Sequence, residues 1–292
     1  MVLRFFFISL LFLPLAGYTA TYPIKLVSGL LVSEATIEGK KVNVIFDSGA
    51  PGLVLNSKYY TTDQPNSSDE YVGINGSFNC QSRLVKNWSW MDAKYRQTSA
   101  ILSDLSFLEN GLNEEIHALV GLSVFSDYYV SLDFDQMTVT LSKKMELDKN
   151  DLIRFQYVDQ LPVITCQIKG EKKILGLDTG SEINYLFSIS AEEKSSLMPY
   201  AIPVLVVGTE NKQDLKYSAN MDVTLNGEAY LSSFIIDKEE VPEFHHTSFD
   251  GFLGLEFLDQ FNIIIHPGKQ IIQFTPRTYS EQGTIVSAVE ME

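Results

Sequence analysis

Apolar and polar positions alternate with a period of two along much of the chain beyond residue 22. Val, Ile, Leu, Phe and Tyr recur in short runs that are broken by Gly, Asn, Asp and Pro, a pattern typical of strands separated by turns. Residues 128–132 and 137–141 alternate in this way, and the Asp-Phe-Asp-Gln segment between them predicts a hairpin turn. A short helix is expected at 191–198, where Pro199 closes it. The pattern therefore predicts an all-β protein.

The chain contains two copies of one unit. Residues 36–50 align without gaps on residues 167–181, at an offset of 131. Further on, residues 118–141 align on residues 251–274 at an offset of 133, and their apolar positions coincide through both predicted hairpins. Because two segments align in the same order at nearly the same offset, we predict two similar β lobes.

The two lobes are predicted to span residues 24–145 and 152–278, with the charged stretch 143–151 as the linker. Residues 1–20 begin with a positive charge, continue with an apolar run and end in small or polar residues, the pattern of a secretory signal peptide. The apolar run is shorter than the ~20 residues that a spanning helix needs. We therefore expect an exported protein, periplasmic or secreted, with no stable membrane span once the signal is removed.

Each unit carries an apolar strand that ends in Asp-Ser/Thr-Gly, at residues 44–49 (VIFDSG) and 175–180 (LGLDTG). A single Asp-Ser-Gly is an ordinary turn, because all three residue types favour tight bends. Two copies in the same frame of a repeat indicate more than a turn. An Asp at the end of an apolar strand costs desolvation energy, so its place there points to a required role.

With these residues the chain resembles the pepsin/retropepsin aspartic peptidases, in which each lobe has such a loop and, later, an apolar-apolar-Gly turn. The later elements here are residues 118–121 (ALVG) and 251–254 (GFLG). The halves are shorter than pepsin lobes, and Ala50 ends the first loop as in retroviral-type enzymes. The chain is thus similar to a bacterial-type, two-lobed (tandem) retropepsin-like protein with both half-sites on one chain.

This resemblance implies a bilobal all-β fold, with two β-barrel-like lobes related by a pseudo-twofold axis. It implies an aspartic endopeptidase that acts as a monomer on peptide or protein substrates without a cofactor. Asp47 and Asp178 would form the catalytic dyad. Two carboxylates ~3 Å apart repel by roughly 5 kcal/mol at an effective dielectric near 20, so such a pair shares a proton. One carboxylate then acts as base on a water while the other donates to the scissile carbonyl.

The loop residues expected to support the dyad are Ser48, Gly49, Thr179, Gly180 and Ser181. In the family the glycines allow the tight turn and the Ser and Thr hydroxyls lock the two loops together. Ser181 lies where a family hydroxyl bonds the outer oxygen of its aspartate, whereas the first loop has Ala50 there. On this basis Asp178 is expected to be the more readily ionised carboxyl. The alternative is that Ser181 only caps its turn.

In this family a hairpin beyond each loop closes over the substrate. The segments 71–77 and 206–211 contain the Gly and Asn that suit a mobile hairpin tip. Trp88 or Trp90 could equally supply the flap aromatic, and an ordinary surface hairpin is the alternative for each segment. The candidate flap residues are Tyr71, Gly73 and Gly208.

Charge and composition narrow the function classes. The formal net charge of −15, from 22 basic and 37 acidic residues, disfavours a nucleic-acid partner. The pair His245-His246 is adjacent rather than at metal-ligand spacing, so no metal site is expected. Two cysteines exclude a disulfide-dense scaffold, and whether Cys80 and Cys166 pair stays open. Two other functions are left: a catalytically silent peptidase-like binding or scaffold protein, and an unrelated β-sandwich adhesion module.

Overall fold

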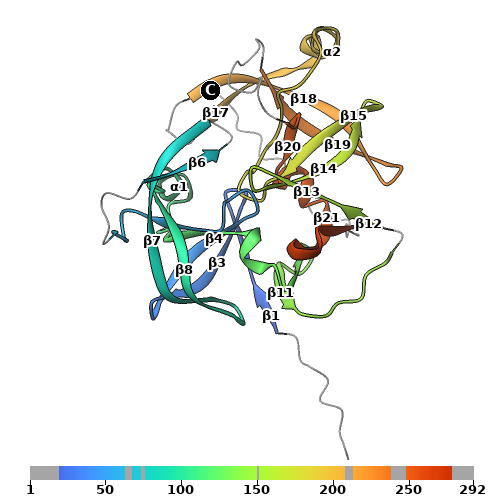
Figure 1. Ribbon diagram of the computed structural model, residues 1–292. Coiled ribbons are helices and arrows are strands. Elements are labelled where there is room, and N and C mark those ends of the chain that lie inside the picture. Colours follow the sequence, from blue (N-terminus) through green and yellow to red (C-terminus); the bar gives the residue numbers. More distant parts are fainter. Residues whose placement is uncertain are drawn as a thin grey trace, which may run out of the picture.

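The computed structural model describes residues 20–62, 68–73, 76–149, 151–207, 213–237 and 248–277. Within these ranges the chain is mostly β, as the apolar alternation predicts. Strands of the first half (blue to green) and of the second half (yellow to red) gather into separate lobes, and strands from both halves meet between them (Figure 1).

The first lobe is built on an eight-stranded sheet. In spatial order its strands are β2 (Lys25–Val27), β3 (Leu30–Ile37), β4 (Lys40–Asp47), β9 (Ala118–Gly121), β5 (Leu53–Asn56), β8 (Ala93–Ser103), β7 (Gly76–Trp90) and β6 (Ser68–Gly73). Strand β3 also pairs with β7, so the sheet curls back on itself like a barrel. Helix α1 (Ser106–Leu112) and a 3₁₀ turn at Leu122–Phe125 complete the lobe.

The second lobe repeats this order strand for strand. Its eight strands are β13 (Gln156–Val158), β14 (Leu161–Ile168), β15 (Glu171–Leu177), β20 (Gly251–Leu253), β16 (Asn184–Leu186), β19 (Glu228–Ile236), β18 (Gln213–Leu225) and β17 (Ile202–Val207). The pairing of β14 with β18 matches that of β3 with β7. Its short helical elements are α2 (Ala191–Leu197), α3 (Leu255–Leu258) and 3₁₀ turns at Met198–Tyr200 and Pro267–Lys269.

A six-stranded sheet joins the lobes. Its order is β1 (Thr21–Pro23), β11 (Thr138–Ser142), β10 (Tyr129–Asp133), β21 (Phe261–His266), β22 (Ile271–Pro276) and β12 (Leu152–Arg154). At its centre β10 pairs with β21, and Ser131 lies opposite Ile264. These two residues differ by 133, the offset of the repeat, so each faces its own counterpart. The pseudo-twofold axis therefore passes through this pair.

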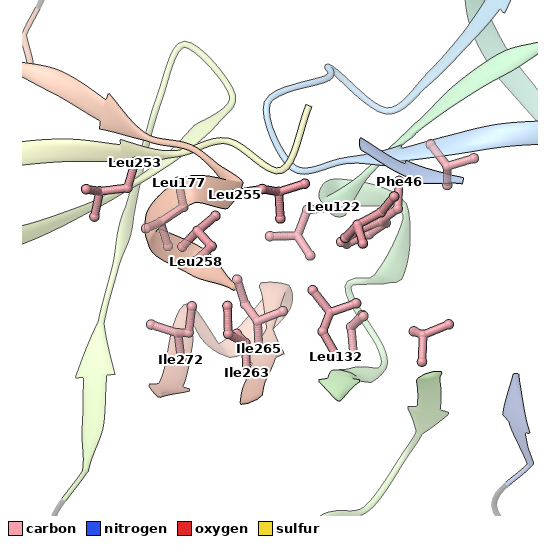
Figure 2. Close-up of a cluster of buried hydrophobic side chains, with 14 of the residues drawn as sticks. Phe46, Leu122, Leu132, Leu177, Leu253, Leu255, Leu258, Ile263, Ile265 and Ile272 are labelled. Carbon is pink, nitrogen blue, oxygen red and sulfur yellow. The ribbon is translucent and has the colours of Figure 1, made fainter. Parts of the chain in front are cut away.

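Apolar side chains fill the space between this joining sheet and the Asp-Ser/Thr-Gly loops. Figure 2 shows Ile263, Ile265 and Leu132 of the joining sheet below Phe46 and Leu177, which precede the two aspartates. All five side chains are at most 5% exposed. The loops of both lobes therefore rest on one apolar floor.

Several local predictions are confirmed. The hairpin is formed by β10 and β11, and the helix predicted at 191–198 is α2 followed by a 3₁₀ turn. Ser190 caps α2 by accepting a hydrogen bond from the backbone N–H of Glu193, whose side chain accepts from the N–H of Ser190. Helix α1 was not foreseen, because it is short and begins without a side-chain cap.

Two further predictions concern the chain's compartment. Of the predicted signal peptide only Ala20 lies among the described residues, so the signal stays a prediction. No helix in the described ranges is long and apolar enough to cross a membrane.

The structure also bears on the two cysteines. Cys166 is a free, buried thiol, so it forms no disulfide with Cys80.

Replacing Trp90 tests the packing of the first lobe. Trp90 is fully buried, stacks on Phe46 at a centroid distance of 5.4 Å and donates from its indole nitrogen to Ser33 at 2.8 Å. We expect Trp90→Ala to lower the free energy of unfolding by about 3–5 kcal/mol, measured by urea denaturation. Leu84 lies on the same strand but is 56% exposed, so Leu84→Ala should change it by about 0.5 kcal/mol or less. Equal losses in both variants would contradict this packing.

Candidate active site

Asp47 is the last residue of β4, and Asp178 directly follows β15. At each position the carboxylate accepts hydrogen bonds from the backbone of its own turn. Oδ1 of Asp47 accepts from the N–H of Gly49 at 2.8 Å and of Ala50 at 3.1 Å. Oδ1 of Asp178 accepts from the N–H of Gly180 at 2.9 Å. Each aspartate side chain thus stabilises its own turn, and the turn in turn fixes the position of the carboxylate.

The two loops interlock through Ser48 and Thr179. The N–H of each residue donates to the side-chain oxygen of the other, at 2.9 Å in both directions. Each hydroxyl also donates to a backbone carbonyl of the opposite lobe, Ser48 to Leu177 at 2.7 Å and Thr179 to Phe46 at 3.0 Å. Four buried hydrogen bonds therefore set the spacing of the loops.

The glycines let the two carboxyls approach. A methyl group on Gly180 would lie 2.4 Å from Cγ of Asp47, and one on Gly49 would lie 2.9 Å from Oδ1 of Asp178. Each glycine thus lies against the carboxyl of the opposite lobe, where any side chain would clash. The methyl group on Gly49 would also lie 3.3 Å from Oδ1 of Asp47, so both carboxyls converge on this glycine. The structure therefore brings the two predicted dyad residues together, with their loop partners around them.

The later glycine of each repeat also marks a close approach. A methyl group on Gly121 would lie 2.2 Å from the backbone oxygen of Ala50, and one on Gly254 would lie 2.2 Å from that of Ile183. Both contacts are with the chain just beyond an aspartate. The apolar-apolar-Gly turns therefore pack directly behind the two loops.

Burial raises the pKa of both carboxyls. For Asp178 the negative charge of Asp47 raises it further, so its pKa lies well above the usual range. For Asp47 the backbone N–H of Gly49, the Asp178 side chain and the N–H of Ala50 each lower the pKa and oppose the effect of burial. The backbone N–H donors of the first loop therefore favour ionisation of Asp47 over Asp178.

This assignment corrects the prediction that Asp178 ionises more readily. That prediction relied on a hydrogen bond from Ser181 to Asp178, but the Ser181 hydroxyl donates to the carbonyl of Ile183 at 2.9 Å. Ser181 also accepts from the N–H of Ile183 at 3.3 Å, so it caps its turn. Asp47 receives two backbone hydrogen bonds and Asp178 only one within the described residues.

A hairpin follows each loop. Strands β6 and β7 pair with Tyr71 opposite Phe78 and Gly73 opposite Gly76, while the Tyr71 side chain lies outside the described residues. Strands β17 and β18 form the second hairpin, and Gly208, at its tip, also lies outside them. A flap role for Tyr71, Gly73 and Gly208 therefore stays a prediction.

The two tryptophans are not flap residues, and that alternative is wrong. Trp88 and Trp90 are 3% and 0% exposed, and the Trp88 indole donates to Thr98 at 2.8 Å. They lie at the far end of β7 from the hairpin tip and pack in the core of the lobe. Burial of their large apolar side chains stabilises the fold, so both tryptophans lie in the core and not at the hairpin tip.

The space beneath the two loops is lined mostly by apolar side chains. A cavity of about 20 Å³ beneath the loops is lined by Ser48, Thr179 and apolar side chains of both lobes and the joining sheet. In the described part of the chain no group of three or more His, Cys, Asp or Glu side chains could hold a metal ion. His245 and His246 lie outside that part.

Comparison with known proteins places this geometry in a fold. No protein-family model matches the chain, and no curated protein matches its sequence. Among solved structures, the aspartic proteinase from Irpex lacteus superposes with a TM-score of 0.59 at 10% sequence identity, over 90% of this chain and 99% of that one. The chain has the aspartic-proteinase fold. The β-sandwich alternative is thereby excluded, and the two lobes are the pseudo-twofold halves of that fold.

Replacing Thr179 tests the interlock of the loops. Thr179→Ala leaves the buried N–H of Ser48 without its acceptor and the carbonyl of Phe46 without its donor. We expect it to lower the free energy of unfolding by about 2–3 kcal/mol. Thr179→Ser keeps the hydroxyl and loses only a methyl group, so its cost should be about 1 kcal/mol. Urea denaturation at one pH measures both, and equal costs would contradict a role for the hydroxyl.

The raised pKa of Asp178 predicts how stability depends on pH. Protonation of this carboxyl stabilises the folded state fully below the unfolded-state pKa, and this contribution is lost as pH rises through the raised folded-state pKa. Between pH 4 and 7 the wild type should lose stability relative to Asp178→Asn, by up to about 1.4 kcal/mol per pH unit. Thermal and urea unfolding across this range measure the difference. Asp222→Asn is the control, because Asp222 is exposed. If the stabilities of the wild type and Asp178→Asn depend on pH in the same way, the raised pKa of Asp178 is refuted.

Proposed function

We propose that this protein is an aspartic endopeptidase, of the two-lobed retropepsin-like type, whose dyad is Asp47 and Asp178. The observation that carries the proposal is the convergence of two carboxyls, one from each lobe, on the glycines of loops that interlock by hydrogen bonds. A buried pair of like charges is costly unless it shares a proton. An acid and a base side by side are what peptide hydrolysis by an activated water requires.

In this mechanism Asp47, as the ionised partner, takes a proton from a water bound between the carboxyls. The resulting nucleophile attacks the carbon of the scissile carbonyl, while Asp178 donates its proton to the carbonyl oxygen. The tetrahedral intermediate collapses when the leaving amine receives a proton from the dyad. The apolar surroundings strengthen each of these electrostatic interactions because the local dielectric is low.

The substrate is a peptide or protein, and both half-sites on one chain support a monomeric enzyme. The apolar N-terminal stretch supports export to the periplasm or the cell exterior, and the net charge of −15 argues against nucleic acid as a partner. The dyad mechanism uses no cofactor.

The second candidate is a catalytically silent binding or scaffold protein that uses the same fold. A binder needs no paired acids, yet this chain keeps both Asp-Ser/Thr-Gly loops together with the glycines that admit the opposite carboxyl. Those glycines are the observation that favours an enzyme, because a binder could replace them without losing the fold's outer surface.

The decisive experiment replaces each aspartate by its neutral isostere. Asp47→Asn and Asp178→Asn should each abolish cleavage of a mixed peptide library between pH 3 and 8, and the double variant should be no worse because the carboxyls act as a unit. Circular dichroism should show that all three remain folded. Wild-type activity should lie on the acidic side of neutral. Peptide binding without cleavage at any pH would support the silent binder. Activity in either single variant would show that the catalytic centre does not consist of Asp47 and Asp178.

A further inference from the structure

The second lobe holds a second charged cluster, and the proposed mechanism does not use it. The carboxylate of Asp237, just after β19, accepts a hydrogen bond from the Tyr185 hydroxyl on one oxygen and from Nζ of Lys216 on the other. Nζ of Lys216 also lies 5.9 Å from the centre of the Tyr185 ring. The charged side chains are only 18% and 11% exposed, so this cluster differs from a solvated surface pair.

This cluster lies on the sheet face that carries the Asp178 carboxyl. Gly176 pairs with Phe252, and a methyl group on Gly176 would lie 3.4 Å from Cβ of Phe252, so the two share a face. Asp178 comes two residues after Gly176 and points to the same side. Phe252 in turn pairs with Tyr185, and their rings stack at 5.8 Å. By strand register, Tyr185 therefore lies on the same sheet face as Asp178, with Phe252 between them.

The hairpin β17–β18 covers that surface. Val204 and Val206 of β17 pack on the buried cluster formed by Tyr185, Ile235 and Phe252. Lys216 lies on β18 directly opposite Val204, so its ion pair with Asp237 and its contact with Tyr185 tie the hairpin to the strands beneath.

The corresponding positions of the first lobe have different residue types. By strand register, Val54 pairs with Leu119 as Tyr185 pairs with Phe252. Ser103 corresponds to Asp237, because each lies two residues after the isoleucine that pairs at the same register. Cys80 corresponds to Lys216. None of the three counterparts is a charged residue type. The ion pair therefore has no counterpart at these register positions, so it does not follow from the shared fold.

We propose that Lys216 is a positioning residue, which clamps the β17–β18 hairpin through Asp237 and Tyr185 onto the face beside Asp178. The clamp makes this side of the peptide site a fixed wall. Its removal should weaken peptide binding and raise KM, while kcat changes little because the carboxyls and their loops are untouched. The effect on KM rests on the proposed peptidase function, whereas the effect on the hairpin does not.

Hydrogen exchange of the backbone amides tests the clamp independently of activity. In Lys216→Met, exchange in β17 and β18 should be faster by about tenfold, with the other strands unchanged. Lys216→Arg keeps the charge and should restore slow exchange. Lys58→Met is the matched control, since Lys58 bonds Glu109, which also accepts from Tyr59, in a similar Lys–carboxylate–Tyr cluster by helix α1. Unchanged exchange in Lys216→Met would overturn the clamp.

Kinetics on a cleaved peptide test its role in the site. KM should rise several-fold in Lys216→Met and remain at the wild-type value in Lys58→Met. If Lys216→Met does not fold, Tyr185→Phe replaces it, because this variant removes only the hydroxyl that donates to Asp237. Its KM should also rise. If Lys216→Met shows faster exchange but an unchanged KM, the hairpin does not form a side of the peptide site, and that part of the proposal is refuted. If the wild type cleaves nothing, the peptidase proposal fails, and the dissociation constant of a library peptide then takes the place of KM.

Discussion

The reciprocal hydrogen bonds between Ser48 and Thr179 are the constraint on which the site depends. Two buried carboxyls of like charge oppose the approach of the loops that carry them, so a separate attraction must hold those loops together. Each of the two residues uses its N–H and its hydroxyl across the lobe boundary, and both hydroxyls end on carbonyls of the other lobe. This arrangement leaves the carboxyls free to share a proton.

The joining sheet and its apolar floor support that contact from below. Because Ser131 pairs with its own counterpart Ile264, the register of β10 and β21 places the two lobes symmetrically about the loops. The residues before the aspartates, Phe46 and Leu177, pack on the same floor (Figure 2). The same burial that stabilises the lobe boundary raises the pKa of both carboxyls, so packing and acid–base chemistry have one cause.

The chemistry arises where the two halves differ. Symmetric carboxyls would have equal pKa values, but Asp47 receives one more backbone hydrogen bond than Asp178 within the described chain, which favours ionisation of Asp47. The outer surfaces differ as well. A buried ion pair fastens β17–β18 to the second lobe, and the corresponding positions of the first lobe have no charged residue. The two halves thus share one frame and differ in the hydrogen bonds and charged residues placed on it.

The sequence by itself determined the all-β class and the two copies of one unit, each with an Asp-Ser/Thr-Gly loop, because both follow from a period or a repeat in the chain. The pairing of Asp47 with Asp178 was implied by the resemblance that those loops carry. Only the tertiary structure decided which donors each carboxyl receives, since Ser181 bonds Ile183 instead of Asp178. It also decided that Trp88 and Trp90 lie in the core, and that residues as far apart as Tyr185 and Asp237 meet. Hydrogen-bond partners and pKa values depend on which atoms come together across strands and lobes, and no local pattern records those distances.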